Sequence, residues 1–264
     1  MKSSFLAIAV AVASVSALPA FAADLPYRKG PPVYTPPPPP IFTWTGFYVG
    51  ANAGGIFTNS SRASATGDAA IVGPGIAAGT IPGSYRTNDS GFIGGGQIGY
   101  NYQMGAFVAG LEADFQGSTL SKTATSLGTG STGTLKSSLD WLGTARGRLG
   151  YVVFDRFLVY GTGGLAYGQT ELNHSLTDTT AGGTLFGGNT LSGSKTTTRA
   201  GWTLGAGGEY AITQNWSVKV EYLYYDLGKS HVLATNAAAV PGAASSVRED
   251  EKGSIIRAGV NYKF

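Results

Sequence analysis

Charged side chains recur at every second position in several segments of this chain. Glu112 and Asp114 are separated by one residue, and so are Lys219 and Glu221. Because side chains alternate between the two faces of a β-strand, residues spaced by two lie on the same face. The charges that share this parity are four acidic and five basic residues: Glu112, Asp114, Arg146, Arg148, Glu209, Lys219, Glu221, Arg257 and Lys263.

Such charges must pair with one another if a closed sheet encloses them. An isolated ion in a low-dielectric interior costs far too much free energy, and a ring of eight strands is just wide enough to be filled by side chains. Nearly equal numbers of both signs therefore predict a lumen ion-pair network that fills and stiffens the interior. The alternative is a narrow gated channel whose conductance depends on the charged side chains exchanging their ion-pair partners. Parity gives no depth, so Asp114 and Lys263 could lie at the mouths.

The other residue patterns indicate no catalytic, cofactor-binding or metal-binding residue, and we expect the protein not to be an enzyme. The chain has no cysteine, which excludes disulfides and thiolate metal sites. His174 and His231 fall in different expected loops, without an identifiable Ser or Asp partner at a strand end. Residues 94–99 match a dinucleotide fingerprint but lack the following helix that it needs. Residues 248–252 are mixed in sign and are expected to form a solvated loop.

The elements that must position the charges show a period of two, which is typical of β-strands. In one of them Phe107, Leu111 and Phe115 share one face while Glu112 and Asp114 share the other. Segments of about ten residues are long enough to cross a bilayer as tilted strands. Residues 157–168 are too glycine-rich for their parity to be assigned. The eight segments are residues 47–54, 92–102, 107–116, 141–151, 157–168, 202–210, 216–224 and 256–264.

The connections between these segments alternate in length. Bacterial membrane barrels have short periplasmic turns and longer external loops. The pattern therefore predicts an all-β fold, an eight-stranded antiparallel up-and-down transmembrane barrel with both chain ends in the periplasm. The long connections are rich in Gly, Ser, Thr and Ala, and we expect four long, mobile external loops. The short connections are 103–106, 152–156 and 211–215, and the long ones are 58–91, 117–138, 169–198 and 226–253.

Composition favours a membrane barrel over a soluble one. Charged residues make up 12% of the chain, against about 25% in soluble domains, which is too few to cover the polar exterior of a soluble barrel. A net charge of +3 gives no indication of nucleic-acid binding. Aromatic residues gather at strand ends, as in the interfacial belts of membrane proteins. The predicted periplasmic aromatic belt contains Tyr100, Tyr102, Phe107, Tyr151, Tyr210 and Trp216.

The N-terminal region predicts two further segments before the barrel at 41–264. Residues 1–22 have a basic start, an apolar middle and the small residues Ala20 and Ala22, which are typical of a cleaved signal peptide. Residues 23–40 contain eight of the twelve prolines. Since proline fixes φ and donates no backbone hydrogen bond, this stretch is expected to be an extended periplasmic tether.

Several short motifs carry a family resemblance that covers residues 22–264. They are AADLP at 22–26, WTGFYVG at 44–50, GRLGY at 147–151, YGTGGLA at 160–166 and GWT at 201–203. In these the chain resembles the outer-membrane immunogenic or porin-family proteins of rhizobial alphaproteobacteria, which are similar to the OmpA-type barrel domain. Tyr262 and Phe264 at the C-terminus look like the signal that the barrel-insertion machinery reads. The resemblance implies location and fold more than activity.

The function expected from these features is that of a structural, surface-exposed outer-membrane protein without catalysis or cofactor. The alternatives are a narrow porin for small solutes and an adhesin or ligand binder that acts through the loops. Expected partners are outer-membrane lipid, lipopolysaccharide, the insertion machinery and periplasmic chaperones, but no nucleic acid; contact with peptidoglycan or a surface ligand stays open. The basic residues expected near lipopolysaccharide phosphates are Lys122, Lys136, Lys195, Arg199 and Lys229.

Overall fold

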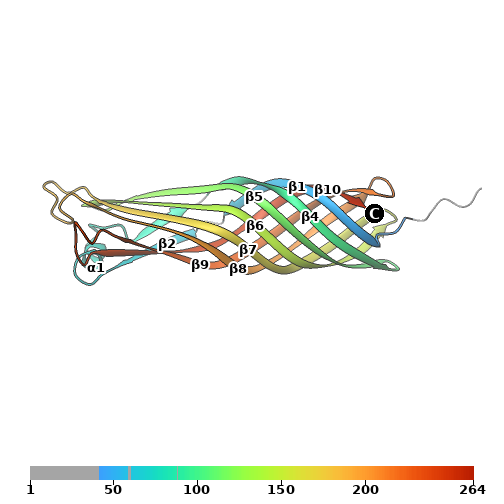
Figure 1. The fold of residues 1–264 in the computed structure, drawn as a ribbon, viewed down its shortest axis with the longest axis horizontal. Coiled ribbons are helices and arrows are strands. Elements are labelled where there is room, and N and C mark those ends of the chain that lie inside the picture. Colours follow the sequence, from blue (N-terminus) through green and yellow to red (C-terminus); the bar gives the residue numbers. More distant parts are fainter. Residues whose placement is uncertain (1–41, 59–60, 88) are drawn as a thin grey trace, which may run out of the picture. The chain divides into compact units, whose positions relative to one another are not determined.

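A computed structural model describes residues 42–58, 61–87 and 89–264. The predicted signal peptide (1–22) and proline-rich tether (23–40) lie outside the described residues. The described chain is β-rich, with one short helix (Figure 1). Its elements are β1 (Gly46–Thr58), β2 (Ser61–Gly67), α1 (Val72–Ala77), β3 (Ser84–Thr87), β4 (Ser90–Met104), β5 (Phe107–Leu127), β6 (Ser131–Phe154), β7 (Phe157–Asp178), β8 (Thr190–Ala211), β9 (Trp216–Thr235) and β10 (Ala244–Lys263).

Eight of the strands form a closed antiparallel ring. Each strand from β4 to β9 pairs with the next one along the chain, and β1 closes the ring by pairing with both β4 and β10. The closing ladder runs from Tyr48 opposite Lys263 to Thr58 opposite Gly253. The connections at 105–106, 155–156 and 212–215 are short and lie at one end of the ring, which we call the turn end. The other end, where α1 lies, we call the helix end (Figure 1).

The predicted long loops are largely strand, which corrects the sequence prediction. Strands β5 and β6 continue together to Leu127 and Ser131, and β7 and β8 continue to Asp178 and Thr190. The connections that remain at the helix end are 128–130, 179–189 and 236–243, together with the segment between β1 and β4. The prediction failed because it required apolar residues on the outward face, whereas these extensions carry polar residues there.

Two additional short strands lie within the long connection between β1 and β4. β2 takes the place of β1 beside β10, with Gly67 opposite Ser245 and Ser64 opposite Arg248, and β3 pairs with β2. The ring is thereby continued on the β10 side beyond the point where β1 ends. Among the residues that the structure describes, no helix is long and apolar enough to cross a membrane.

The glycine run at 94–99 lies inside β4 and has no helix after it. Gly95 faces the neighbouring strand so closely that a Cβ atom there would lie 2.0 Å from the carbonyl oxygen of Phe115. This glycine therefore permits close approach of β4 and β5, in agreement with the rejection of a nucleotide-binding loop.

Candidate functional site: a charge network across the lumen

The strand register brings the inward charges of β5, β6, β8, β9 and β10 to similar levels of the ring. Glu112 lies opposite Arg146 in the β5–β6 ladder, and Arg257 lies opposite Glu221 in the β9–β10 ladder. Since alternate residues point inward, the two charges that β5, β6 and β9 each contribute are two residues apart, while β8 and β10 contribute one charge each. Eight of the nine residues named from the sequence are at least 96% buried and meet in one network: Glu112, Asp114, Arg146, Arg148, Glu209, Lys219, Glu221 and Arg257.

Two arginines form the centre of this network. Arg146 contacts Glu112, reaches Asp114 Oδ2 with Nη2 at 2.9 Å and reaches Glu221 Oε1 with Nη1 at 3.0 Å. Arg257 Nη2 lies 2.5 Å from Glu221 Oε2 and 3.0 Å from Asp114 Oδ2. Each guanidinium thus contacts carboxylates from two other strands, so the network ties opposite sides of the ring together.

The remaining charges extend the network toward the turn end. Lys219 Nζ lies 2.8 Å from Glu112 Oε2, and Arg148 Nη2 lies 2.7 Å from Glu209 Oε2. The Tyr48 hydroxyl donates to Glu112 Oε2 at 2.8 Å. Four basic and four acidic side chains therefore neutralise each other.

Lys263 lies outside this network, which corrects the sequence prediction for that residue. Its Nζ donates to the carbonyl of Thr43 and lies 4.5 Å from the ring centre of Phe42. Trp44, beside them, is 3% exposed and packs with Phe42 in an apolar cluster at the turn end. Lys263 is the last residue of β10 at the turn end, so its side chain lies at the mouth of the ring.

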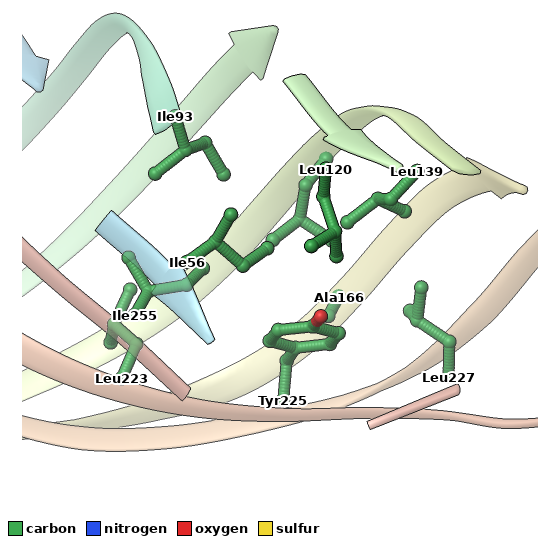
Figure 2. Packing of buried hydrophobic residues seen from close by; sticks show 10 residues of the cluster. Ile56, Ile93, Leu120, Leu139, Ala166, Leu223, Tyr225, Leu227 and Ile255 are labelled. Carbon is green, nitrogen blue, oxygen red and sulfur yellow. The ribbon is translucent and has the colours of Figure 1, made fainter. Parts of the chain in front are cut away.

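An apolar layer lies next to the charges on the helix-end side. Beyond Glu221 and Arg257, the next inward residues of β9 and β10 are Leu223 and Ile255 (Figure 2). Side chains from the other strands meet them in the middle of the ring, where they are at most 3% exposed. This layer contains Ile56, Ile93, Leu120, Leu139, Leu142, Ala166, Leu223, Tyr225, Leu227 and Ile255.

Around the charge network, the outward face of the ring is apolar and is bounded by aromatic residues. Mid-strand residues such as Leu149 and Leu204 are 72% and 60% exposed. All six residues of the predicted periplasmic belt point outward near the turn end and are 39–64% exposed. A second aromatic layer, containing Phe115, Trp141, Tyr167, Trp202 and Tyr224, faces outward some ten residues farther along the strands. We call the surface between the two layers the membrane band.

Beyond the membrane band lies the part of the ring that we call the helix-end half, whose strands enclose an apolar core. Leu135, Leu172 and Val247 point inward and are at most 2% exposed, and Tyr85 of β3 packs with them. A second group at the helix end includes Leu176, Leu191 and Phe186. The polar composition of these segments concealed this core. The inward positions of β7, β8 and β10 continue the parity of the predicted strands, whereas those of β6 change parity at a β-bulge between Leu139 and Trp141 and those of β9 change parity at Gly228.

Three buried charges of this region were missed by sequence reasoning. Lys122 was expected at the surface, and Glu249 and Glu251 were expected in a solvated loop. All three point inward and are at most 5% exposed, and Lys122 Nζ lies 3.2 Å from Glu249 Oε1. The charge run at 248–252 is part of strand β10, and its side chains point alternately inward and outward. The sequence signal for this was the period of two, which continues without interruption from Val247 to Arg257.

The two histidines also lie in strands rather than loops. His174 is buried in β7, where Nε2 lies 3.1 Å from Ser245 Oγ and Nδ1 lies 3.3 Å from the Thr134 carbonyl. Burial lowers the pKa of His174 to about 4. His231 is exposed on β9, with Nε2 3.2 Å from Lys195 Nζ. Within the described residues, no group of three or more His, Asp or Glu side chains could hold a metal ion.

Comparison with known proteins agrees with this architecture. The chain is 37% identical over 268 residues to the 31 kDa outer-membrane immunogenic protein of Brucella melitensis, covering 100% of both chains. It is 30% identical over 153 residues to the 22 kDa outer membrane protein of Rhizobium leguminosarum bv. viciae, covering 54% of this chain and 60% of the relative. The outer membrane protein OprG of Pseudomonas aeruginosa has a similar fold, with a TM-score of 0.50 and 13% identity over 83% of this chain and 96% of OprG.

The match to a family model extends over nearly the whole chain. The model describes an outer membrane protein β-barrel domain and matches residues 6–264. The relatives carry the names of outer-membrane immunogenic proteins rather than of enzymes. The chain belongs to the outer membrane β-barrel domain family.

Proposed function

We propose that this chain is a structural, surface-exposed outer-membrane barrel whose lumen is closed and which performs no catalysis. The observation that carries the proposal is the neutral network of eight buried charges that joins opposite sides of the ring. The apolar layer beside it adds a second barrier, because an ion would have to leave its water to cross it. The charge network lies within the membrane band, and the apolar layer lies at the helix-end boundary of that band.

We also propose an orientation, with the helix end outside the cell and the turn end, with both chain termini, in the periplasm. Support comes from the short connections at the turn end and from the polar outer wall of the helix-end half, as is usual for bacterial barrels. In this arrangement the helix-end half would present the surface antigen, while Lys136 and Lys229 would lie within reach of lipopolysaccharide phosphates.

The closed lumen is tested by recording single-channel currents from the purified barrel in a planar bilayer. We expect no stable conductance from the wild-type chain. Replacing Leu223 and Ile255 with Ala would thin the apolar layer, and adding Arg146→Ala would open the charge layer; only the triple variant is expected to conduct. Stable wild-type conductance that changes on Arg146→Ala or Glu209→Ala would instead support a porin.

The orientation and structural role are tested on intact cells. The chain has no cysteine, so single variants can be labelled cleanly. A membrane-impermeant thiol reagent should label Ala181→Cys in whole cells but Asp155→Cys only after lysis; the reverse would overturn the orientation. Cells that lack the protein should become sensitive to detergent, and the Arg146→Lys variant should restore resistance if it folds. Unchanged detergent resistance would contradict the structural role.

A further inference from the structure

A second group of buried charges lies beyond the membrane band. Glu249 and Glu251 are two residues apart on β10 and both point inward. A single lysine, Lys122 of β5, lies between them, with Nζ 3.2 Å from Glu249 Oε1 and 3.7 Å from Glu251 Oε2. Ser137 of β6 donates to Glu251 Oε1 at 3.4 Å. The group is enclosed between the apolar layer of the lumen and the apolar core of the helix-end half.

Glu251 is weakly held in this group. Its contacts of 3.4 and 3.7 Å are long compared with the 2.5–3.0 Å contacts of Glu221 in the lumen network. The charged or titratable groups facing Glu251 are Lys122 from β5, Arg199 from β8, Tyr225 from β9 and Glu249 from its own strand. A buried carboxylate with long contacts and a carboxylate neighbour is disfavoured in its ionised form.

We propose that Glu251 is a proton-binding site whose occupancy controls how tightly the helix-end half of the barrel packs. When the Glu251 carboxyl is protonated it is neutral, and Lys122 pairs with the one negative charge of Glu249. The space between the apolar layer and the apolar core then contains no negative charge on Glu251. When the proton leaves, a second negative charge is enclosed beside Glu249, and the cost of its burial outweighs the attraction of Lys122 and Arg199. Opening the strands that hold this group, β5, β6 and β10, to water then lowers the free energy.

The direction of the pH response follows from the chemistry of the buried acid. Burial raises the pKa of Glu251 to about 7, with Lys122 opposing the rise and Glu249 adding to it. Since the folded pKa lies above the value of 4.5 for an exposed carboxyl, the folded state binds a proton that the unfolded state releases. The stability that Glu251 contributes to the helix-end half is therefore fully present below pH 4.5, and it is lost as the pH rises from 4.5 to about 7.

His174 responds to pH in the opposite direction and must be removed from the test. Burial holds the pKa of His174 at about 4, below the ordinary value of 6.5. This histidine therefore costs stability as the pH falls from 6.5 to about 4. In the wild-type chain the two responses oppose each other between pH 4.5 and 6.5, so a flat profile would be uninformative. The H174Q background isolates the contribution of Glu251.

The experiment uses the full-length barrel in detergent micelles, with ¹³C-labelled glutamate carboxyls followed by NMR. We expect one carboxyl resonance to titrate near pH 7 and to disappear in E251Q. In H174Q, amide protection factors of residues 244–250 should fall at least about tenfold between pH 5 and 7.5. In H174Q/E251Q they should not change, because glutamine mimics the protonated acid, and D140N on the outer face of β6 serves as a control that should leave the fall intact.

Two results would overturn the proposal. If the Glu251 carboxyl titrates near 4.5, the site does not hold its proton at neutral pH. If protection in H174Q and H174Q/E251Q responds to pH in the same way, proton binding at residue 251 does not control the packing of this half.

Discussion

The two halves of the barrel place polar and apolar side chains on opposite faces. In the membrane band of β7, Leu165 and Tyr167 point outward. Past Tyr167, the outward residues of the same strand are polar, such as Glu171 and Asn173, and the inward residue Leu172 is buried. β7 thus crosses from an apolar-outside to an apolar-inside pattern, in an unbroken ladder with β8 and in a ladder with β6 that has a β-bulge between Leu139 and Trp141.

The difference follows from the solvent that surrounds each half. Lipid accepts apolar side chains on the outer wall, so the charges of the membrane band lie inside and must neutralise each other. Water surrounds the helix-end half in the proposed orientation, so apolar residues are buried inside by the hydrophobic effect. The same backbone architecture therefore has an ionic core in one half and a hydrophobic core in the other.

The largest expected effect comes from leaving a charge unpaired in the ionic core. Arg257→Met removes the partner of Glu221 and Asp114. We expect the free energy of unfolding in micelles to fall by about 3–5 kcal/mol, measured by urea titration of tryptophan fluorescence. Arg248→Met on the exposed face of the same strand is the control and should change it by less than about 0.5 kcal/mol. Equal losses in both variants would show that the network contributes no specific stability.

The hydrophobic core of the helix-end half is tested by a cavity. Leu135 is fully buried there, and Leu135→Ala should cost about 2–5 kcal/mol in the stability of that half. Because the membrane band has its own core, amide exchange should accelerate at 131–139 and stay unchanged at 143–151. Uniform acceleration along the whole of β6 would contradict two separately stabilised halves.

A lysine placed on the outer wall should be tolerated in one half only. Leu204 and Thr196 both face outward from β8, in the membrane band and beyond it. Leu204→Lys is expected to cost about 1–3 kcal/mol, somewhat less than lysine at the bilayer midplane because Leu204 lies two residues from Trp202, while Thr196→Lys should change stability by less than about 0.5 kcal/mol. Urea unfolding in lipid vesicles measures both, and similar costs would place the membrane boundary elsewhere.

The smallest expected effect concerns one loop of the helix-end half. Asp178 accepts backbone hydrogen bonds from Phe186 at 2.7 Å and from Leu185 at 3.1 Å. Burial opposes ionisation, but these hydrogen bonds outweigh it and hold the pKa of Asp178 below its ordinary value. The stability that Asp178 contributes is therefore present above pH 3.8 and is lost as the pH falls further.

Removal of that carboxylate should loosen the loop without affecting the rest of the barrel. In Asp178→Ala we expect thermolysin to cleave residues 179–189 several times faster at neutral pH, while global stability falls by about 1 kcal/mol. Thr179→Ala, whose exposed side chain lies next to it, is the control. Unchanged cleavage would show that the loop is held by contacts of Phe186 alone.

The sequence predicted the membrane band better than the helix-end half. Alternation of residues such as Leu111 and Glu112 identified eight ring strands, because lipid outside and charges inside produce a strong period of two. The extensions were read as loops because Ser, Thr and Gly dominate their outward positions. Their inward apolar residues, Leu172 and Val247 among them, are few and separated by polar neighbours. Where water surrounds the barrel, the apolar side chains point inward, which is the opposite of the pattern expected for a strand in lipid.

The members of the charge network were accessible to sequence reasoning, while their pairing was not. Parity placed Glu112 and Arg146 on the inner face, but only the register of the strands determines that they are neighbours. Lys263 shared the same parity, yet its position beside the chain end put it at the mouth. Lys122 and Glu251 were missed because they belong to the extensions.

The reversal of faces along one strand is tested most directly by spin labels on β7 in lipid vesicles. A nitroxide at Leu165→Cys should be relaxed by oxygen, which concentrates in lipid, and one at Ser175→Cys by a water-soluble nickel complex. A label at Leu172→Cys should be shielded from both. The contrary result, with Ser175 accessible to oxygen like Leu165 or with Leu172 open to nickel, would show that β7 does not cross from lipid to water with its faces reversed.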